Sequence, residues 1–363
     1  MWMGSELGIL HISPATATWI YLILLAAGAF AAFSRWSTIT AILRRRRTGV
    51  VSVLIVVAAI GALFLVVRAW NPAIFWGEKP MDFSFLNAFL QAAQWPTGEP
   101  WMAGMPLHYY YFGEVLAAYP MLVAGCTSGV GYNLISATIP ALFAGVLAGL
   151  GLLLTRGRRP AIAASVLPLL VILTGNLAWP WLINTLREGN IFDFWWATSR
   201  VIPGFAIDEY PLWTTLFADL HGHFIAFPIL LVTFAWGWLC VQANDKKWMV
   251  SAALCGVSAA VLVATNPWDL FILTTTLGVG VVVASHRPLR GLLRLGTAGA
   301  VSVLVAAPFI VELVAGISAG AGERGLFLTD ADFAPAWAIL IHFGLCLLYT
   351  SDAADDDTIV YIS

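Results

Sequence analysis

The sequence predicts an all-α protein that crosses a membrane several times as a bundle of helices. Of its 363 residues, 60% are hydrophobic and 10% are charged, and the mean hydropathy is +0.85. Soluble domains carry about 25% charged residues, so this composition lies outside their range. The apolar runs are continuous and about 20 residues long, which suits helices in a bilayer. A β-barrel would instead require short segments of alternating hydrophobicity.

The apolar runs predict eight full membrane helices and a truncated ninth. The predicted spans are 18–36, 50–70, 131–155, 160–184, 224–243, 248–265, 268–285 and 295–315, with the truncated helix beginning at 335. A shorter run at 111–127 contains Glu114 and Pro120, and we expect it not to cross the bilayer.

Clusters of Lys and Arg predict the orientation in the membrane, because such clusters favour the cytoplasmic side. They occur at 44–47, 156–159, 246–247 and 287–294, and all four then fall on one side. We therefore expect the N-terminus outside a plasma membrane and nearly all acids on or near the outer face. This asymmetry predicts an outer site rich in carboxylates, although outer loops that are simply longer would give the same pattern.

Other global features say less about function. The net charge of -2 does not indicate nucleic acid as a partner, and the four cysteines show no metal or disulfide spacing. The first apolar run lacks a basic flank, so a cleaved signal peptide is not expected. Oligomeric state is left open.

The last residues, 346–363, do not look native. They begin CLLYTSDAAD, which resembles one reading frame of a transposon-type sequencing adapter. We therefore expect an integral membrane domain over 1–345 and a non-native tail, the alternative being a genuine acidic tail.

The stretch 76–114 is the longest run too polar to cross the bilayer. It holds the carboxylates Glu78, Asp82, Glu99 and Glu114 and the run His108-Tyr109-Tyr110-Tyr111. Polar chemistry concentrated in a membrane protein predicts a functional site. The alternative is a structured loop whose aromatic residues lie at the lipid–water interface.

An interfacial helix is predicted inside this stretch. Pro80 suits a first helical turn, and apolar residues on one face of 81–93 suit a helix lying in the interface. Asp82 in the first turn would be stabilised by the helix dipole, and it can also act as a general base on a substrate hydroxyl. Glu78 precedes the proline and need not share that face.

A second polar stretch, 185–223, contains two further candidate sites. Asp219, His221 and His223 form D-x-H-x-H, which predicts a divalent-cation site (Mg or Mn) if the segment is extended; the alternative is helix capping and interfacial histidines. Arg200 lies in an aromatic segment and suits a phosphate ligand or a snorkelling side chain. The tyrosines at 109–111 suit packing or stacking on a sugar or headgroup.

Several ordered motifs resemble a known family. MDFSFLNAF at 81–89, HYYYFGE at 108–114, EYPLWTTLFADLHGH at 209–223 and ATNPWD at 264–269 resemble the YYY family of uncharacterised membrane proteins. That family is similar to the C-type (GT-C) membrane glycosyltransferases, which take sugar from a polyprenyl-phosphate carrier on the outer face. They typically use a carboxylate in a first outer loop that contains interfacial helices.

The resemblance implies a GT-C-like bundle and inverting transfer from a lipid-linked sugar donor. Asp82, with Glu78 second, would be the base; Arg200 or a cation at Asp219, His221 and His223 would neutralise the phosphate. The remaining substrate-binding candidates are His108, Tyr109, Tyr110, Tyr111, Glu114, Asp208, Glu209 and Asp269. The alternatives are a transporter or lipid flippase, with coupling carboxylates, and a non-catalytic membrane assembly protein.

Overall fold

The structure is a computed structural model that is helical throughout its described elements. It describes residues 12–155, 157–178, 182–183, 186, 191–202, 207–243, 245–320, 337–338 and 340–342. Within these ranges only two isolated β-bridges occur, so the predicted all-α bundle is confirmed. The chain forms two compact units, Met1–Pro168 with Asp219–Gly322, and Leu169–Ala218 with Glu323–Ser363.

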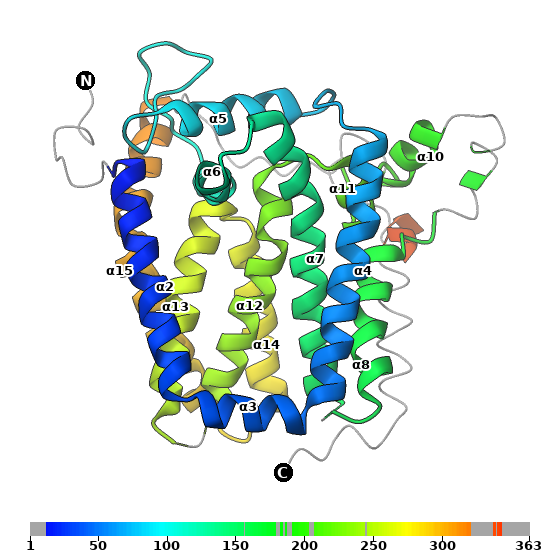
Figure 1. The fold of residues 1–363 in the computed structure, drawn as a ribbon, viewed down its shortest axis with the longest axis vertical. Helices are drawn as coiled ribbons and strands as arrows, with labels where there is room; N and C mark the ends of the chain where they lie inside the picture. Colours follow the sequence, from blue (N-terminus) through cyan, green and yellow to red (C-terminus); the bar gives the residue numbers. More distant parts are fainter. Residues whose placement is uncertain are drawn as a thin grey trace. The chain divides into compact units, whose positions relative to one another are not determined.

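The first unit contains most of the helices (Figure 1). They are α2 (Pro14–Ser34), α3 (Trp36–Arg45), α4 (Arg47–Trp70), α5 (Lys79–Gln91), α6 (Phe112–Ala124), α7 (Ser128–Leu154), α8 (Pro160–Pro168), α12 (Gly222–Gln242), α13 (Lys247–Thr265), α14 (Asp269–Ala284) and α15 (Pro288–Gly320).

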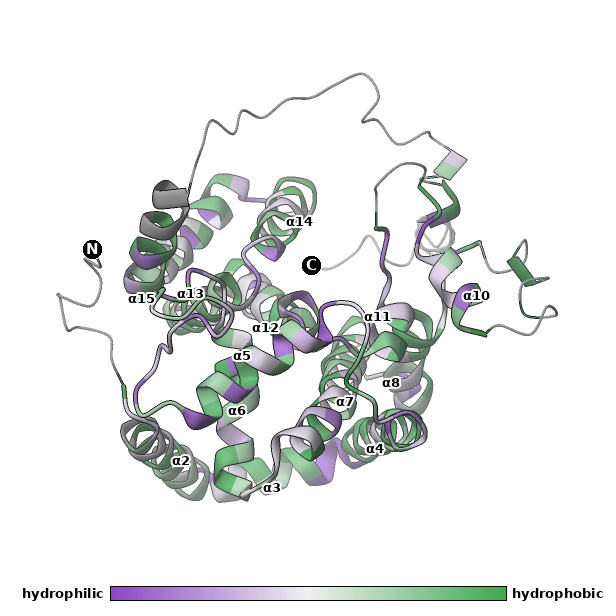
Figure 2. Ribbon diagram, turned by 90° about the horizontal axis from the view of Figure 1, so that it is seen from above, coloured by the Kyte–Doolittle hydropathy of each residue, from purple (hydrophilic) through white to green (hydrophobic). Residues whose placement is uncertain are grey.

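Six of these helices are long and apolar enough to cross a membrane. They are α2, α4, α7, α12 and α13, together with Pro288–Val314 of α15. Each coincides with a predicted span, which confirms a multi-pass membrane protein. The apolar helices at Pro160–Leu173 and Asp269–Val283 are shorter than 18 residues. Figure 2 shows that the long helices are mostly green, which marks hydrophobic residues. Surfaces that face lipid are expected to be hydrophobic.

Two helices of the first unit lie across one end of the bundle. In Figure 1, α5 runs across the long helices and α6 is seen end-on, which agrees with the expectation that 111–127 does not cross. Pro80 occupies the first turn of α5, and Asp82 follows it there. Proline suits this position because its missing N–H would have no partner in a first turn.

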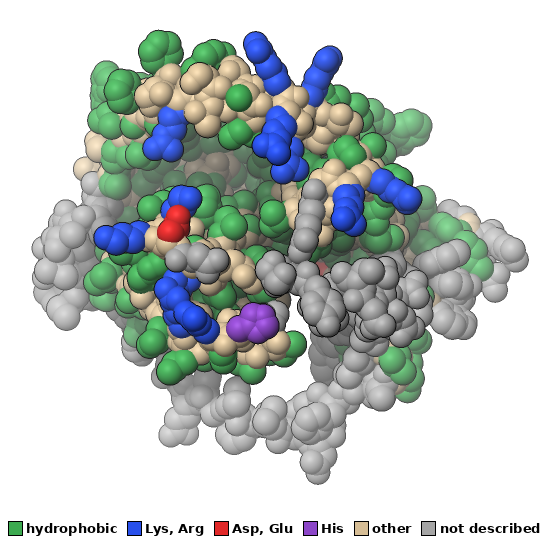
Figure 3. Space-filling model, turned by 90° about the horizontal axis from the view of Figure 1, so that it is seen from below, with side chains coloured by type: hydrophobic (Ala, Val, Ile, Leu, Met, Phe, Trp, Pro, Cys, Tyr) green, Lys and Arg blue, Asp and Glu red, His purple; other side chains and the backbone are tan. Residues whose placement is uncertain are grey.

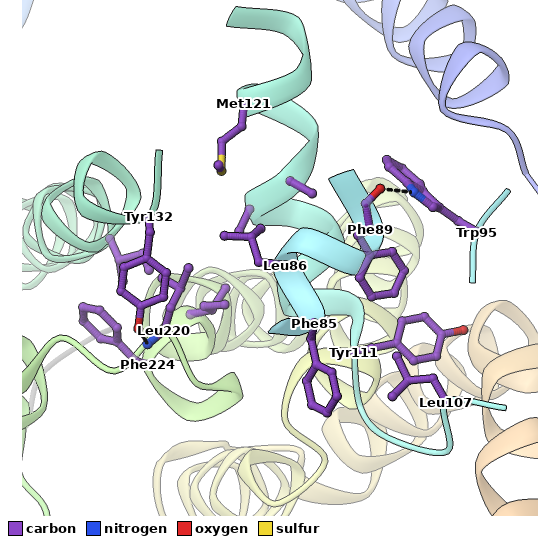
Figure 4. Close-up of a cluster of buried hydrophobic side chains, with 14 residues drawn as sticks. Phe85, Leu86, Phe89, Trp95, Leu107, Tyr111, Met121, Tyr132, Leu220 and Phe224 are labelled. Carbon is purple, nitrogen blue, oxygen red and sulfur yellow. Dashed lines mark hydrogen bonds between the residues drawn. The ribbon is translucent and has the colours of Figure 1, made fainter. Parts of the chain in front are cut away.

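The apolar face of α5 fixes these crossing helices to the bundle. Its Phe85, Leu86 and Phe89 are at most 3% exposed and pack in a cluster with side chains from α6, α7 and α12 (Figure 4). Trp95 adds a hydrogen bond of 2.9 Å from its indole Nε1 to the Phe89 carbonyl. Burying side chains of this size contributes about 1.5–3 kcal/mol each, so the position of α5 is strongly determined.

The opposite end of the first unit is basic. It carries α3 and the turns that join α7 to α8, α12 to α13 and α14 to α15. Lys and Arg side chains are spread over this face, with far fewer acids (Figure 3). The predicted separation of basic clusters from the carboxylate-rich loops is thus present within this unit, whereas the assignment of one end to the cytoplasm stays a prediction.

The second unit consists of short elements. They are a π-helix, η1 (Leu169–Leu173), followed by α10 (Ile191–Thr198) and α11 (Pro211–Phe217). The predicted span 160–184 is therefore wrong at residues 174–178, which are not helical, whereas residues 182–183 are helical again. Pro168 removes one backbone donor just where the α-helical pattern changes, which is a known cause of such breaks. The predicted tail at 346–363 lies outside the described residues.

Candidate functional site

The centre of the candidate site is His221, which two carboxylates of α5 and its flank approach. The imidazole Nδ1 lies 3.2 Å from Asp82 Oδ1 and 3.1 Å from Glu78 Oε2. Nδ1–H therefore donates toward both oxygens. These groups come from segments 139 residues apart, joined here because α5 lies across the start of α12.

Asp219 completes the acidic side of the cluster. Its Oδ2 accepts a hydrogen bond of 3.0 Å from the Glu78 backbone N–H, which ties the loop before α12 to the start of α5. Asp219 also hydrogen-bonds the carboxyl of Asp82. One carboxyl group can donate to another only when it carries a proton, so this bond requires a proton on Asp219.

Two tyrosines close the other side of the imidazole. His221 Nε2 lies 3.2 Å from the Tyr109 hydroxyl and 3.3 Å from the Tyr110 hydroxyl, and their rings stack with centroids 4.1 Å apart. His108 and Tyr111, which flank this pair in the sequence, lie in different surroundings. His108 is exposed, and Tyr111 packs in the apolar cluster with its hydroxyl 3.4 Å from Glu312 Oε2.

The electrostatics of the cluster follow from burial and from the opposed charges. Burial raises the pKa of Asp219, and the hydrogen bond and charge of Asp82 raise it further. For His221, burial lowers the pKa, but the hydrogen bond and charge of Asp82 and the charge of Glu78 outweigh it and raise the pKa to about 9. At neutral pH the site therefore holds an imidazolium between Asp82 and Glu78, beside a protonated Asp219.

Accessibility differs sharply between the two carboxylates that contact His221. The Asp82 side chain is 0% exposed and that of Glu78 is 59% exposed. The second oxygen of Asp82, Oδ2, is buried and meets no N–H donor among the described residues, and the Asp219 carboxyl is its protonated neighbour. Glu78 is thus the carboxylate open to solvent, and Asp82 is the one held in a fixed position.

Two buried cations near the acids were missed from the sequence. Lys79 is 6% exposed and Arg68 is 3% exposed. Burial and the charge of Arg68 lower the pKa of Lys79 to about 8, with Asp219 opposing them, so Lys79 remains mostly protonated at neutral pH. The signal was present in WGEKPMD, where Lys79 stands between Glu78 and Asp82.

Glu114, in the first turn of α6, is a second acid that is buried as deeply as Asp82. It is 1% exposed, and neither carboxyl oxygen meets a hydrogen-bond donor within the described part of the chain. Burial raises its pKa to about 8, and the charge of Asp82 adds to the rise. Glu114 is therefore mostly protonated at neutral pH.

Asp269 and His223 form a smaller neighbouring pair. Asp269 begins α14, is 9% exposed and hydrogen-bonds Asn266, while His223 is close enough to act on its charge. The rings of His223 and His221 have centroids 5.4 Å apart. The structure thus brings the ATNPWD and ADLHGH segments together.

The predicted metal ligands do not fit a metal site in this arrangement. Both ring nitrogens of His221 face other partners, carboxylates at Nδ1 and tyrosine hydroxyls at Nε2. Across the described ranges, no three His, Cys, Asp or Glu side chains are grouped so that they can hold an ion. The divalent cation stays a prediction, and no step below depends on it.

The other predicted site residues belong to the second unit. The Arg200 guanidinium lies 4.0 Å from the centre of the Trp196 ring and donates to Ser199 O at 2.8 Å. Asp208 is 7% exposed and accepts from the Val201 backbone at 3.0 Å. Glu209 accepts from the Thr214 hydroxyl at 2.9 Å. The contacts named here all lie within that unit.

Fold and site together define a multi-pass helical membrane protein with a partly buried acid–histidine cluster beside the crossing helix α5. The family model described as "Uncharacterized membrane protein (DUF2298)" matches residues 1–353, so the chain belongs to this family. The membership agrees with the family resemblance seen in the motifs. Comparison with curated proteins and with solved structures found no match.

Proposed function

We propose that this protein is a GT-C-like glycosyltransferase that uses a polyprenyl-phosphate-linked sugar on the outer face of the plasma membrane. The observation that carries the proposal is the contact of His221 with Asp82 and Glu78, at an interfacial helix of the first long loop. A polyprenyl phosphate presents its headgroup at this depth, and a positioned carboxylate is what attack by a hydroxyl requires.

In the proposed reaction Asp82 is the base. The acceptor oxygen attacks the anomeric carbon, and the bond from that carbon to the phosphate oxygen breaks as the new carbon–oxygen bond forms. The acceptor proton passes to the Asp82 carboxylate, which His221 and Asp219 contact from the protein side. A single displacement inverts the anomeric centre. His221 keeps the carboxylate in position, and Glu78 meets the substrate from the solvent side.

The leaving phosphate needs positive charge, since it departs as an anion. Lys79 supports this role because it lies in the same turn as the two carboxylates and remains mostly protonated at neutral pH. The alternatives from the sequence, Arg200 and a bound cation, stay predictions. Tyr109 and Tyr110 present the stacked rings that suit contact with the sugar.

The test is transfer of labelled sugar from polyprenyl phosphate in membranes that contain the protein. Asp82→Asn keeps the size of the side chain but removes the base, and we expect turnover to fall about 10²–10⁴-fold with the amount of folded protein unchanged. Glu99→Gln is the control, because Glu99 lies in the same loop and bonds the Trp101 backbone. Undiminished transfer by Asp82→Asn would remove Asp82 from the mechanism.

A proton-coupled transporter is a second candidate, and Glu114 favours it. A fully buried carboxyl that holds a proton near neutral pH is what proton coupling needs. In proteoliposomes a transporter would exchange a lipid or solute between the two sides, with a rate that depends on the pH gradient and is lost in Glu114→Gln. A wild type that moves no sugar across a broad donor panel but shows this exchange would replace the glycosyltransferase proposal.

A further inference from the structure

A cavity lies at the basic end of the first unit, where α3 meets α4. Its volume is about 630 Å³, and the walls come from the end of α3, the first turns of α4, and the segment that joins α7 to α8. Arg45, Arg46 and Thr48 supply its polar lining. Val53, Leu54 and Leu152 supply an apolar wall that continues along two membrane-spanning helices.

The charge in this cavity is not neutralised by the protein. Arg45 and Arg46 are exposed, and within the described residues neither takes part in an ion pair. The acid described on this face, Asp245, already pairs with Lys247 at 3.1 Å. Neighbouring arginines at 44, 47, 158 and 159 strengthen the positive potential. The cavity is therefore complementary to an anion.

Two glycines shape the cavity around the Arg46 side chain. Gly157 has φ +73, and a Cβ there would lie 2.6 Å from Arg46 Nη1. A Cβ on Gly49 would lie 3.3 Å from Leu152 Cδ1. The lack of side chains at these positions lets the guanidinium lie against the turn between α7 and α8 while α4 and α7 stay close below it.

We propose that this cavity binds the headgroup of an anionic phospholipid, whose acyl chain lies along the apolar wall. The guanidinium groups of Arg45 and Arg46 match a phosphate through planar, bidentate hydrogen bonds. Leu54 is 61% exposed on a spanning helix, so the apolar wall is open to the lipid phase directly below the arginines. A free phosphate would leave that wall unused. The inference is independent of the proposed function.

The experiment measures binding of labelled phosphatidylglycerol to the detergent-solubilised full chain, with unlabelled phosphatidylcholine present throughout. In Arg45→Gln/Arg46→Gln we expect affinity to fall about thirtyfold, since each basic residue near an anionic headgroup contributes about 1 kcal/mol. The matched control is Arg287→Gln/Arg290→Gln, which removes equal charge from the same face without touching the cavity lining. Its affinity should change less than about threefold.

A third variant tests the acyl chain separately from the charge. Leu54→Trp keeps both arginines and replaces an exposed side chain, so folding is expected to be unaffected, but it fills the apolar part of the cavity. Phosphatidylglycerol binding should fall, while any binding of inorganic phosphate should not. Equal losses in the two arginine double variants would mean a diffuse surface charge and overturn the proposal. Full competition by millimolar inorganic phosphate, or binding untouched by Leu54→Trp, would also overturn it.

Discussion

At the α5 end of the first unit, Asp82 and Glu114 are each 1% exposed, whereas Asp245 and Lys247 at the α3 end are exposed and pair with each other. Burying an ionisable group is expensive unless it is paired, and ion pairs on a surface contribute little. The acids of the α5 end therefore stay buried only because they are protonated or paired, whereas the charges of the α3 end are solvated by water.

The comparison indicates that the α5 end is suited to moving protons and the α3 end to binding anionic headgroups. Groups with shifted pKa values in a buried cluster are typical of sites that move protons. Arginines that remain open and unpaired are typical of surfaces that meet anionic headgroups. The four predictions below test this contrast, from the largest expected effect to the smallest.

The first prediction concerns the two faces of the membrane and is all or none. In a background without the four native cysteines, a membrane-impermeant thiol reagent added to intact cells should label Gly98→Cys and not Thr48→Cys. The reason is that these exposed positions lie at opposite ends of the first unit, and basic clusters favour the cytoplasm. Labelling of Thr48→Cys alone would reverse the orientation.

The second prediction concerns stability at the acidic end. His221→Ala leaves the buried Asp82 carboxylate without its imidazolium partner, and loss of one member of a buried pair costs about 3–5 kcal/mol. The free energy of unfolding in detergent should fall by about that amount. Lys247→Ala, which breaks an exposed pair at the other end, should leave it unchanged. Similar losses in the two variants would contradict the contrast between the ends.

The third prediction concerns pH and follows from Glu114. Its pKa in the folded protein, about 8, is above the ordinary value of 4.5, so the folded state binds the proton more tightly than the unfolded state. The stabilising effect is complete below about pH 4.5 and is lost as pH rises toward about 8, by about 1.4 kcal/mol per pH unit.

The measurement is the unfolding free energy of the wild type and of Glu114→Gln between pH 5 and pH 8. In Glu114→Gln, the part of the slope of unfolding free energy against pH that comes from Glu114 should be absent. Glu99→Gln should keep it, because that substitution removes a carboxyl group from the loop before α6, at a less buried position. A wild type whose slope equals that of Glu114→Gln would show that Glu114 does not bind a proton in this range.

The fourth prediction compares two tyrosines near the site. The Tyr132 hydroxyl accepts a hydrogen bond of 2.9 Å from the buried Leu220 N–H (Figure 4), so Tyr132→Phe should cost about 1–3 kcal/mol. The Tyr119 hydroxyl is buried with no partner among the described residues, so Tyr119→Phe should be neutral or slightly stabilising. Equal effects in a thermal melt would mean that the Leu220 bond contributes nothing.

Much of the fold was predictable because a bilayer imposes simple rules on length and polarity. The spans of α4 and α7 and the helix at Pro80 were located from continuous apolar runs and from the preference of proline for a first turn. The break after Leu173 was not, because hydropathy gave no sign that residues 174–178 leave the helix. Hydropathy indicates whether a segment can lie in a membrane, but it does not indicate whether the backbone hydrogen bonds of a helix continue along it.

The candidate site was predictable only in part. Asp82, Glu78, Asp219 and His221 were all singled out, because polar residues are rare in such a chain. Their arrangement was not, as D-x-H-x-H suggested three ligands of one ion. In the structure His221 instead turns to carboxylates that lie 139 and 143 positions away in the chain. Contacts over such separations depend on tertiary packing, which local patterns do not report.

The distance in sequence between Asp82 and His221 also sets an order of events during synthesis. The ribosome makes the chain from the N-terminus, so α5 is complete well before α12 exists. Until α12 is inserted, Asp82 has no imidazole partner and must remain hydrated at the membrane surface. An amphipathic helix in the interface keeps Asp82 in contact with water during this time. The translocon therefore does not have to release an unneutralised acid into lipid, and the cluster is assembled only when the later helices reach it.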